Sequence, residues 1–148
     1  MDRATVSVQM LIRKSPDAVF NAFVDPRLIE KFWLRSASGP LAKGARVEWE
    51  FMVPGARETV AVTEFVPGRG IAFTWSGGVA VKMAFDPYDT SDTRVTVSAT
   101  GFDATHTVDA TEGFAIVLCD LKSFLETGRS GNMVRDKAAL IAAGKAGG

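Results

Sequence analysis

The sequence predicts an α+β fold in which an antiparallel sheet packs against one long helix near the C terminus. Two observations carry this prediction. Residues 109–128 repeat apolar side chains at the helical period, and residues 46–99 contain segments that alternate apolar and polar side chains between short turns. A helix with one apolar face needs an apolar surface to lie on, and one face of such a sheet provides it.

The long helix is expected over residues 109–128. Its apolar stripe consists of Phe114, Val117, Leu118, Leu121 and Leu125. Asp109 with Glu112 three positions later is typical of a capping box, although Thr107 could cap an earlier first turn. Gly128 can adopt the left-handed conformation that ends a helix.

The first third of the chain predicts one strand and two short helices. Residues 6–12 alternate as in a half-buried strand. Ser15-Pro16 and Asp25-Pro26 are start signals, because the first residue caps a helix and proline lacks the N–H that would be unsatisfied there. Residues 34–43 contain serine, glycine and proline and are expected to form a loop.

Five further strands are expected. They cover residues 46–53, 59–66, 71–75, 79–85 and 95–99, with a polar loop at 86–92. Because turns this short join antiparallel neighbours, the strands should form a meander. Trp49, Phe51, Phe73 and Trp75 alternate with smaller or polar residues, so they should share the sheet face that meets the long helix.

Length and composition are those of a single globular domain. The chain has 148 residues, of which 47% are hydrophobic and 23% charged. We expect one domain over residues 1–148, with a core at about 4–128 and a C-terminal tail at 129–148. The tail has apolar residues that could form a short amphipathic helix, and residues 144–148 are expected to fray.

Charge and hydropathy disfavour two classes of partner. Seventeen basic residues balance seventeen acidic ones without a long run of either sign, which disfavours nucleic-acid binding. The longest apolar run, residues 114–119, is too short to span a membrane, and residues 1–12 do not resemble a signal peptide. A single cysteine excludes an internal disulfide. We therefore expect a cytoplasmic protein without a nucleic-acid or membrane partner.

Two motifs resemble a known family. The segment IRKSPDAVFNAFVDP at residues 12–26, followed by Phe32-Trp33, is similar to its opening motif, and VTEFVP at 62–67 with IAFTW at 71–75 is similar to its central motif. The family is the SRPBCC (START/Bet v-like) superfamily, in the branch related to the C-terminal domain of heat-shock-protein-90 ATPase activators. The resemblance implies a helix-grip (Bet v-like) fold: a curved antiparallel sheet around the long C-terminal helix, with two short helices after the first strand.

The resemblance also implies a hydrophobic cavity between the long helix and the sheet. Its expected lining residues are Trp33, Trp49, Phe51, Phe73, Trp75, Met83, Phe85, Phe114, Val117, Leu118 and Leu121. Aromatic walls with few polar groups are typical of small-ligand cavities, but a solidly packed core gives the same periodicity. Three polar groups are candidates for this pocket: Arg35 at its entrance, Glu64 if it faces inward, and His106 at its rim; the alternative for each is a solvated surface group.

The sequence offers no catalytic residue, metal ligand set or cofactor motif. His106 is the only histidine, and it has no histidine or cysteine neighbour that could share a metal. Cys119 is expected in the middle of the helix, where no base or helix N-terminus would activate its thiol. Cys119 and Ile116 lie on the outer face of the helix, so this face should be covered either by the C-terminal tail or by a second subunit in a homodimer.

Three functions remain as hypotheses. The first is a protein that binds a hydrophobic, lipid-like or aromatic small molecule without a cofactor. The second is an enzyme similar to the polyketide cyclases and dehydratases of the superfamily, which the shortage of histidine, cysteine and paired inward carboxylates disfavours. The third is an interaction module that modulates a chaperone ATPase, which the balanced charge and the missing N-terminal activator domain disfavour.

Overall fold

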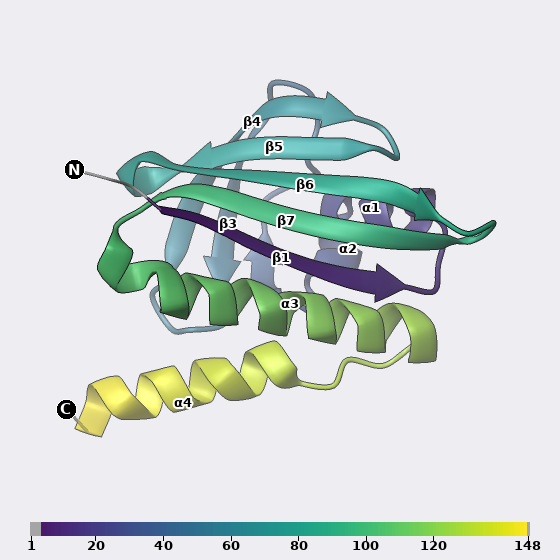
Figure 1. Cartoon of the computed structure of the whole chain (residues 1–148). Helices are drawn as coiled ribbons and strands as arrows, with labels where there is room; N and C mark the ends of the chain where they lie inside the picture. The colour runs from purple at the N-terminus through teal and green to yellow at the C-terminus, as the bar shows by residue number, and fades with distance from the viewer. Residues whose placement is uncertain (1–3, 148) are drawn as a thin grey trace.

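The computed structural model describes residues 4–147, which form one seven-stranded antiparallel sheet and four α-helices (Figure 1). The strands are β1 (Ala4–Ile12), β2 (Leu34–Ala37), β3 (Arg46–Phe51), β4 (Arg57–Val66), β5 (Gly70–Trp75), β6 (Val79–Tyr88) and β7 (Asp92–Phe102). The helices are α1 (Pro16–Val24), α2 (Pro26–Ile29), α3 (Thr107–Thr127) and α4 (Met133–Gly147), with short 3₁₀ turns η1 (Ser76–Gly78) and η2 (Ala104–His106).

The strand order is β1-β7-β6-β5-β4-β3-β2, so the predicted meander is confirmed and β1 closes it beside β7. All pairs are antiparallel. The sheet curves around α3, and α1 and α2 follow the first strand, as the helix-grip fold requires (Figure 1). The chain therefore has the expected α+β architecture.

Local signals set the starts of the two short helices. The Oγ of Ser15 accepts a hydrogen bond from the N–H of Ala18 at 3.3 Å, and the Oδ1 of Asp25 accepts one from the N–H of Arg27 at 2.9 Å. Pro16 and Pro26 occupy the first helical position in each case. Asp25 has an extended backbone, with ψ of 120°. This one residue therefore ends α1 and caps the start of α2.

The long helix α3 ends where the sequence predicts but starts differently. Gly128 has φ of 80° and terminates the helix in the left-handed conformation. The expected capping box at Asp109 is wrong, because Asp109 lies within the first turn and His106 precedes the helix without a side-chain cap. The chain is already wound at this point, since Asp103 accepts a hydrogen bond from the N–H of Thr105 at 2.9 Å and starts η2.

Three expectations are corrected. Residues 34–37 form the edge strand β2, which is too short to show an alternating pattern and is held by pairing with β3. The polar loop at 86–92 shrinks to residues 89–91, because β6 and β7 continue pairing to Tyr88 and Asp92. The tail forms a helix from Met133 to Gly147, longer than the short helix expected, and the alanines in its first ten residues favour the helical state. Gly148 lies outside the described residues.

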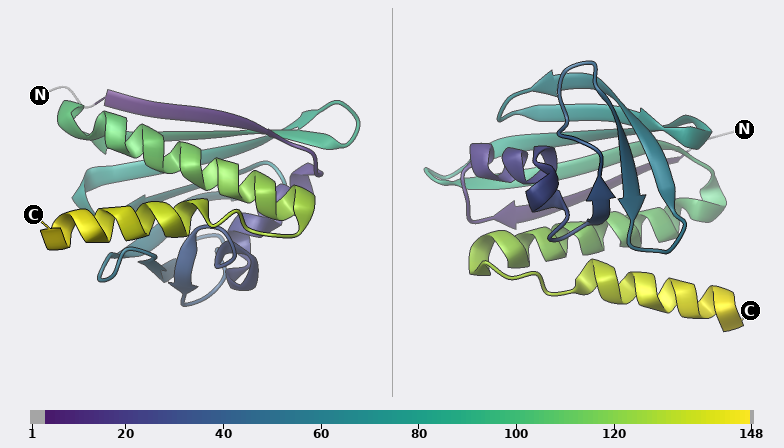
Figure 2. Two further views of the ribbon diagram at one scale, coloured as in Figure 1. Left: turned by 90° about the horizontal axis from the view of Figure 1, so that it is seen from below. Right: turned by 180° about the vertical axis from the view of Figure 1, so that it is seen from behind.

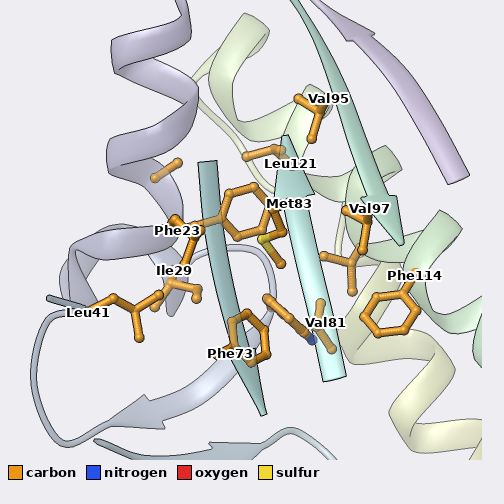
Figure 3. Packing of buried hydrophobic residues seen from close by; sticks show 14 of the residues in the cluster. Phe23, Ile29, Leu41, Phe73, Val81, Met83, Val95, Val97, Phe114 and Leu121 are labelled. Atoms are coloured by element: carbon orange, nitrogen blue, oxygen red, sulfur yellow. The ribbon is translucent and has the colours of Figure 1, made fainter. Parts of the chain in front are cut away.

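The core lies between the sheet and α3 and is closed at one end by α1 and α2. Figure 3 shows side chains from these helices and from the central strands meeting in one cluster. Leu118 and Leu121 of α3 are fully buried, as are Phe73 of β5 and Phe85 of β6. None of the helices within residues 4–147 combines the length and hydrophobicity needed to cross a bilayer.

Helix α4 turns back along α3, on the outer side of that helix. In both views of Figure 2 the two helices lie side by side. Val134 packs against the hydrophobic core, while Leu140 is 69% exposed. The tail therefore folds over the outer face of the long helix within the same chain, which was one of the two coverings that the sequence left open.

Candidate functional site

An open apolar pocket of about 330 Å³ lies between α3, α4 and one end of the sheet. Its wall consists mainly of aromatic and aliphatic side chains from α3, α4 and the ends of β3, β5 and β7. They are Trp33, Phe51, Met52, Val53, Ala56, Trp75, Phe102, Ala110, Gly113, Phe114, Ile116, Val117, Val134, Lys137, Ala138 and Ile141. Lys137 is the only one of these residues with a charged side chain. The pocket is thus suited to an apolar molecule.

Three aromatic residues form the sheet side of the wall. Trp33 follows α2, Phe51 ends β3 and Trp75 ends β5. The ring centroids of Trp33 and Phe51 are 6.2 Å apart, and those of Phe51 and Trp75 are 5.8 Å apart. Contacts of this kind stabilise aromatic pairs beyond the area they bury, so the wall is preformed.

Helix α3 supplies one side of the pocket through its helical period. Ala110, Gly113, Phe114 and Val117 follow one another at three- and four-residue steps and therefore share one face. Gly113 has no side chain, and a Cβ built on it would meet no heavy atom within 4 Å. This glycine leaves part of the pocket empty.

Helix α4 supplies the opposite side. Val134, Ala138 and Ile141 recur at the helical period and face the pocket. Lys137 lies on the same face, and its Nζ is 2.6 Å from the Oε1 of Glu112 on α3. Its charge is therefore balanced at the rim, while its aliphatic stem contributes to the wall.

Asp120 of α3 fixes the position of α4. This carboxylate is 1% exposed and accepts hydrogen bonds from the Oγ of Ser130 at 2.9 Å, the N–H of Gly131 at 2.8 Å and the N–H of Val134 at 3.3 Å. Because Val134 is in the first turn of α4, Asp120 satisfies an N–H that has no partner within that helix. A buried residue of one helix thus caps the next.

The structure divides the predicted cavity residues into two groups. Trp33, Phe51, Trp75, Phe114 and Val117 line the pocket. The other residues are packed in the core at 0–2% exposure and do not line it: Trp49, Phe73, Met83, Phe85, Leu118 and Leu121. These side chains occupy the space between the middle of α3 and the central strands. The ring centroids of Trp49 and Phe73, for example, are 5.2 Å apart. The pocket therefore does not lie at the middle of α3, where the sequence predicted it. It lies at the N-terminal half of α3, on the side of that helix that faces α4.

Sequence reasoning missed the contributions of the β3–β4 turn, the end of β7 and α4. The turn contributes Met52, Val53 and Ala56, and β7 contributes Phe102. The spacing of the apolar residues in the tail did indicate an amphipathic helix. It carried no information on the surface that this helix would cover.

The three polar candidates lie outside the apolar pocket. Glu64 is exposed on β4, so the alternative in which it faces inward is wrong. His106 is 65% exposed, and its Nδ1 lies 2.9 Å from the Oδ1 of Asp103. Hydrogen bonds from Thr105 and His106 lower the pKa of Asp103 to about 2, so His106 belongs to a local network before α3. Arg35 is exposed and lines a neighbouring pocket.

The described residues also show how the remaining polar groups are used. Within residues 4–147 every buried side-chain nitrogen or oxygen atom has a hydrogen-bond partner. No three histidine, cysteine or carboxylate side chains in this part of the chain lie close enough together to hold a metal ion. Cys119 is partly buried on α3.

A comparison with known families matches residues 13–126 to AHSA1, described as Activator of Hsp90 ATPase homolog 1-like protein. The chain belongs to this family. The matched range includes α1, α2 and six of the seven strands in full, and it ends at Glu126, one residue before the end of α3. The wall that α4 contributes to the pocket of this AHSA1-family protein lies beyond the matched range.

Solved structures show the same fold. Protein SSP2350 from Staphylococcus saprophyticus is 27% identical, with a TM-score of 0.78 over 86% of this chain and 95% of that one. The Aha1 dimer from Colwellia psychrerythraea is 19% identical, with a TM-score of 0.78 over 86% and 99%. DynU16, a protein from the dynemicin biosynthetic locus, is 22% identical, with a TM-score of 0.78 over 85% and 48%. The last two likenesses concern the fold alone. No curated protein matches the AHSA1-family chain.

Proposed function

We propose that this AHSA1-family protein binds a hydrophobic small molecule, lipid-like or aromatic, in the pocket between α3, α4 and the sheet. The observation that carries the proposal is the composition of the wall, in which a single charged residue stands among aromatic and aliphatic ones. The volume of about 330 Å³ falls at the lower end of the range for small-ligand sites, roughly 300–1,000 Å³. Binding an apolar molecule would remove this exposed wall from water.

The pocket wall favours binding over catalysis. No histidine, cysteine or carboxylate is among the residues that line it. Lysine can also act as a general acid, general base or nucleophile, and Lys137 is the one lining residue of this kind. Its ammonium group is already paired with Glu112, with Nζ 2.6 Å from Oε1. Glu112 is not among the lining residues. The cyclase-like and chaperone-modulating alternatives have no comparable support from this site.

Substitution of Gly113 tests the proposal, because this residue lines the pocket and a Cβ built on it would meet no heavy atom within 4 Å. Nile red, a neutral apolar dye, should bind the parent protein and change the emission of Trp33 and Trp75. Gly113→Leu places a branched side chain in the empty space and should abolish dye binding. The matched control, Gly113→Ala, should retain dye binding and raise the free energy of unfolding by roughly 0.5–1 kcal/mol.

Thermal unfolding of each variant accompanies the titrations. Gly113→Leu should unfold at the same temperature as the parent or higher, because it adds apolar contacts in open space. A parent protein that does not bind Nile red, or a folded Gly113→Leu variant that binds it as the parent does, would contradict the proposal.

A further inference from the structure

A second pocket of about 460 Å³ lies on the other side of α4 and differs from the first in its charge. Arg35 of β2 and Arg135 of α4 both line it, together with Glu30. Met52 and Ala138 line both pockets, so the two pockets border each other at these residues. An apolar site and a site with two guanidinium groups are therefore adjacent along one helix.

The two arginines are free to bind an anion. Within the part of the chain that the structure describes, neither guanidinium group forms an ion pair or a hydrogen bond. The carboxylate of Glu30 instead accepts a hydrogen bond from the N–H of Ala37 at 3.1 Å. The charged residues that line this pocket are Arg35, Arg135 and Glu30. The pocket therefore has two positively charged side chains and one negatively charged side chain.

Lys137, the only other cation at this end of α4 that lines either pocket, is already paired. Its Nζ is 2.6 Å from the Oε1 of Glu112. An anion that entered the apolar pocket would have to compete with Glu112 for this ammonium group. Beside Arg35 and Arg135 the lining carboxylate is that of Glu30, which forms no ion pair with either arginine among the described residues and accepts the N–H of Ala37 instead.

We infer that the ligand is an amphipathic carboxylate, with its apolar part in the first pocket and its carboxylate at Arg35 and Arg135 in the second. This inference rests on the proposed function and adds the chemical class of the ligand. The apolar part would pass Met52 and the small side chain of Ala138, where the pockets meet. The planar guanidinium group matches a carboxylate with two parallel hydrogen bonds, so arginine suits this head group.

Three probes with the same alkyl chain separate the head group from the tail: decanoate, decanol and decylamine. Each is titrated against the Nile red complex of the full chain at neutral pH and low salt. Decanoate should displace the dye at about one tenth of the concentration that decanol requires, as expected for a charge-assisted hydrogen bond. Decylamine should bind no more tightly than decanol, because its ammonium group would face the two arginines.

The double variant Arg35→Gln/Arg135→Gln should lose the preference for decanoate and bind decanol as the parent does. Both residues are exposed, so the substitutions leave the core intact. The matched control is Arg129→Gln, which removes an exposed guanidinium group from the segment between α3 and α4 that lines neither pocket. This variant should retain the preference for decanoate.

The outcomes distinguish this inference from the proposed function. Equal binding of decanoate and decanol by the parent would overturn the inference and leave the apolar pocket as a binding site. A preference that survives in the double arginine variant, or that is lost in Arg129→Gln alone, would also overturn it. Failure of the parent to bind Nile red, decanol and decanoate would overturn the proposed function itself.

Discussion

Glu126 shows how one side chain fastens the end of α3 to the end of β1. Its Oε2 accepts hydrogen bonds from the N–H of Arg13 at 2.8 Å and from the Nζ of Lys122 at 2.7 Å. Burial raises the pKa of Glu126, but the hydrogen bonds from Lys122 and Arg13 outweigh it and hold the pKa below the ordinary value of 4.5. The ionised form is therefore bound more strongly in the folded state than in the unfolded state.

Because the pKa of Glu126 is lower in the folded state, the stability of the protein should decrease on acidification. The contribution of Glu126 to stability is fully present above pH 4.5 and is lost as the pH falls through the folded-state pKa. Glu126→Gln should therefore lower the free energy of unfolding at neutral pH, and the difference from the parent should shrink as the solution is acidified. Urea unfolding of the parent and of Glu126→Gln at several pH values between neutral and acidic measures this difference in the free energy of unfolding. A difference that does not change with pH would show that the charge of Glu126 is not involved.

At the scale of elements, Asp120 connects α3 to α4. Asp120→Asn keeps the size of the side chain but replaces one acceptor oxygen by an NH₂ group, which cannot accept the hydrogen bonds from the start of α4. We expect a loss of roughly 1–3 kcal/mol in the local stability of α4, as for a buried polar group without its partner. Hydrogen exchange should become faster over residues 133–147 while the sheet stays protected.

Ser130→Ala provides the comparison for this variant, because it leaves both backbone hydrogen bonds to Asp120. It removes the hydrogen bond from the Oγ of Ser130 to Asp120 and the one that this Oγ accepts from the N–H of Asn132 at 2.9 Å. Its effect on exchange in α4 should be smaller. Nile red affinity should fall in the same order, since Val134, Ala138 and Ile141 form part of the pocket wall. Unchanged protection of α4 in Asp120→Asn would mean that apolar contacts alone hold this helix.

At the scale of the whole molecule, α4 covers an apolar surface that would otherwise face solvent. A chain that ends at Gly131 would expose Phe114, Ile116 and Val117. Exposed patches of this kind promote association, so the shortened chain should sediment as larger species than the full chain at equal concentration. Sedimentation velocity of the full chain and of the shortened chain measures the size of the species that each forms.

A homodimer of the full chain through the outer face of α3 and the C-terminal tail stays a prediction, and Leu140 of the tail, which is exposed, makes it testable. Leu140→Ser should convert such a dimer to a monomer without loosening the pocket. If the full chain and the shortened chain are both monomeric, α4 is not needed to prevent association and its role is confined to the pocket.

The sequence by itself determined the two short helices, the long helix, six of the seven strands and the face of the sheet that is apolar; the edge strand β2 was expected to be a loop. Helix starts at Ser15 and Asp25, the helix end at Gly128 and the alternation in the strands are local signals, since each depends on residues a few positions apart. These signals were sufficient for the α+β architecture, because turns as short as these leave antiparallel pairing as the only connection.

Only the tertiary structure decided which apolar residues form the core and which line a pocket. Trp49 and Trp75 have the same alternation on neighbouring parts of the sheet, yet Trp49 is 2% exposed in the core and Trp75 lines the pocket. Periodicity identifies the apolar face of an element, but the distance between two elements determines whether the space between them is filled. The cap at Asp120 and the position of α4 depend on the same spatial relations, so no pattern along the chain could have predicted them.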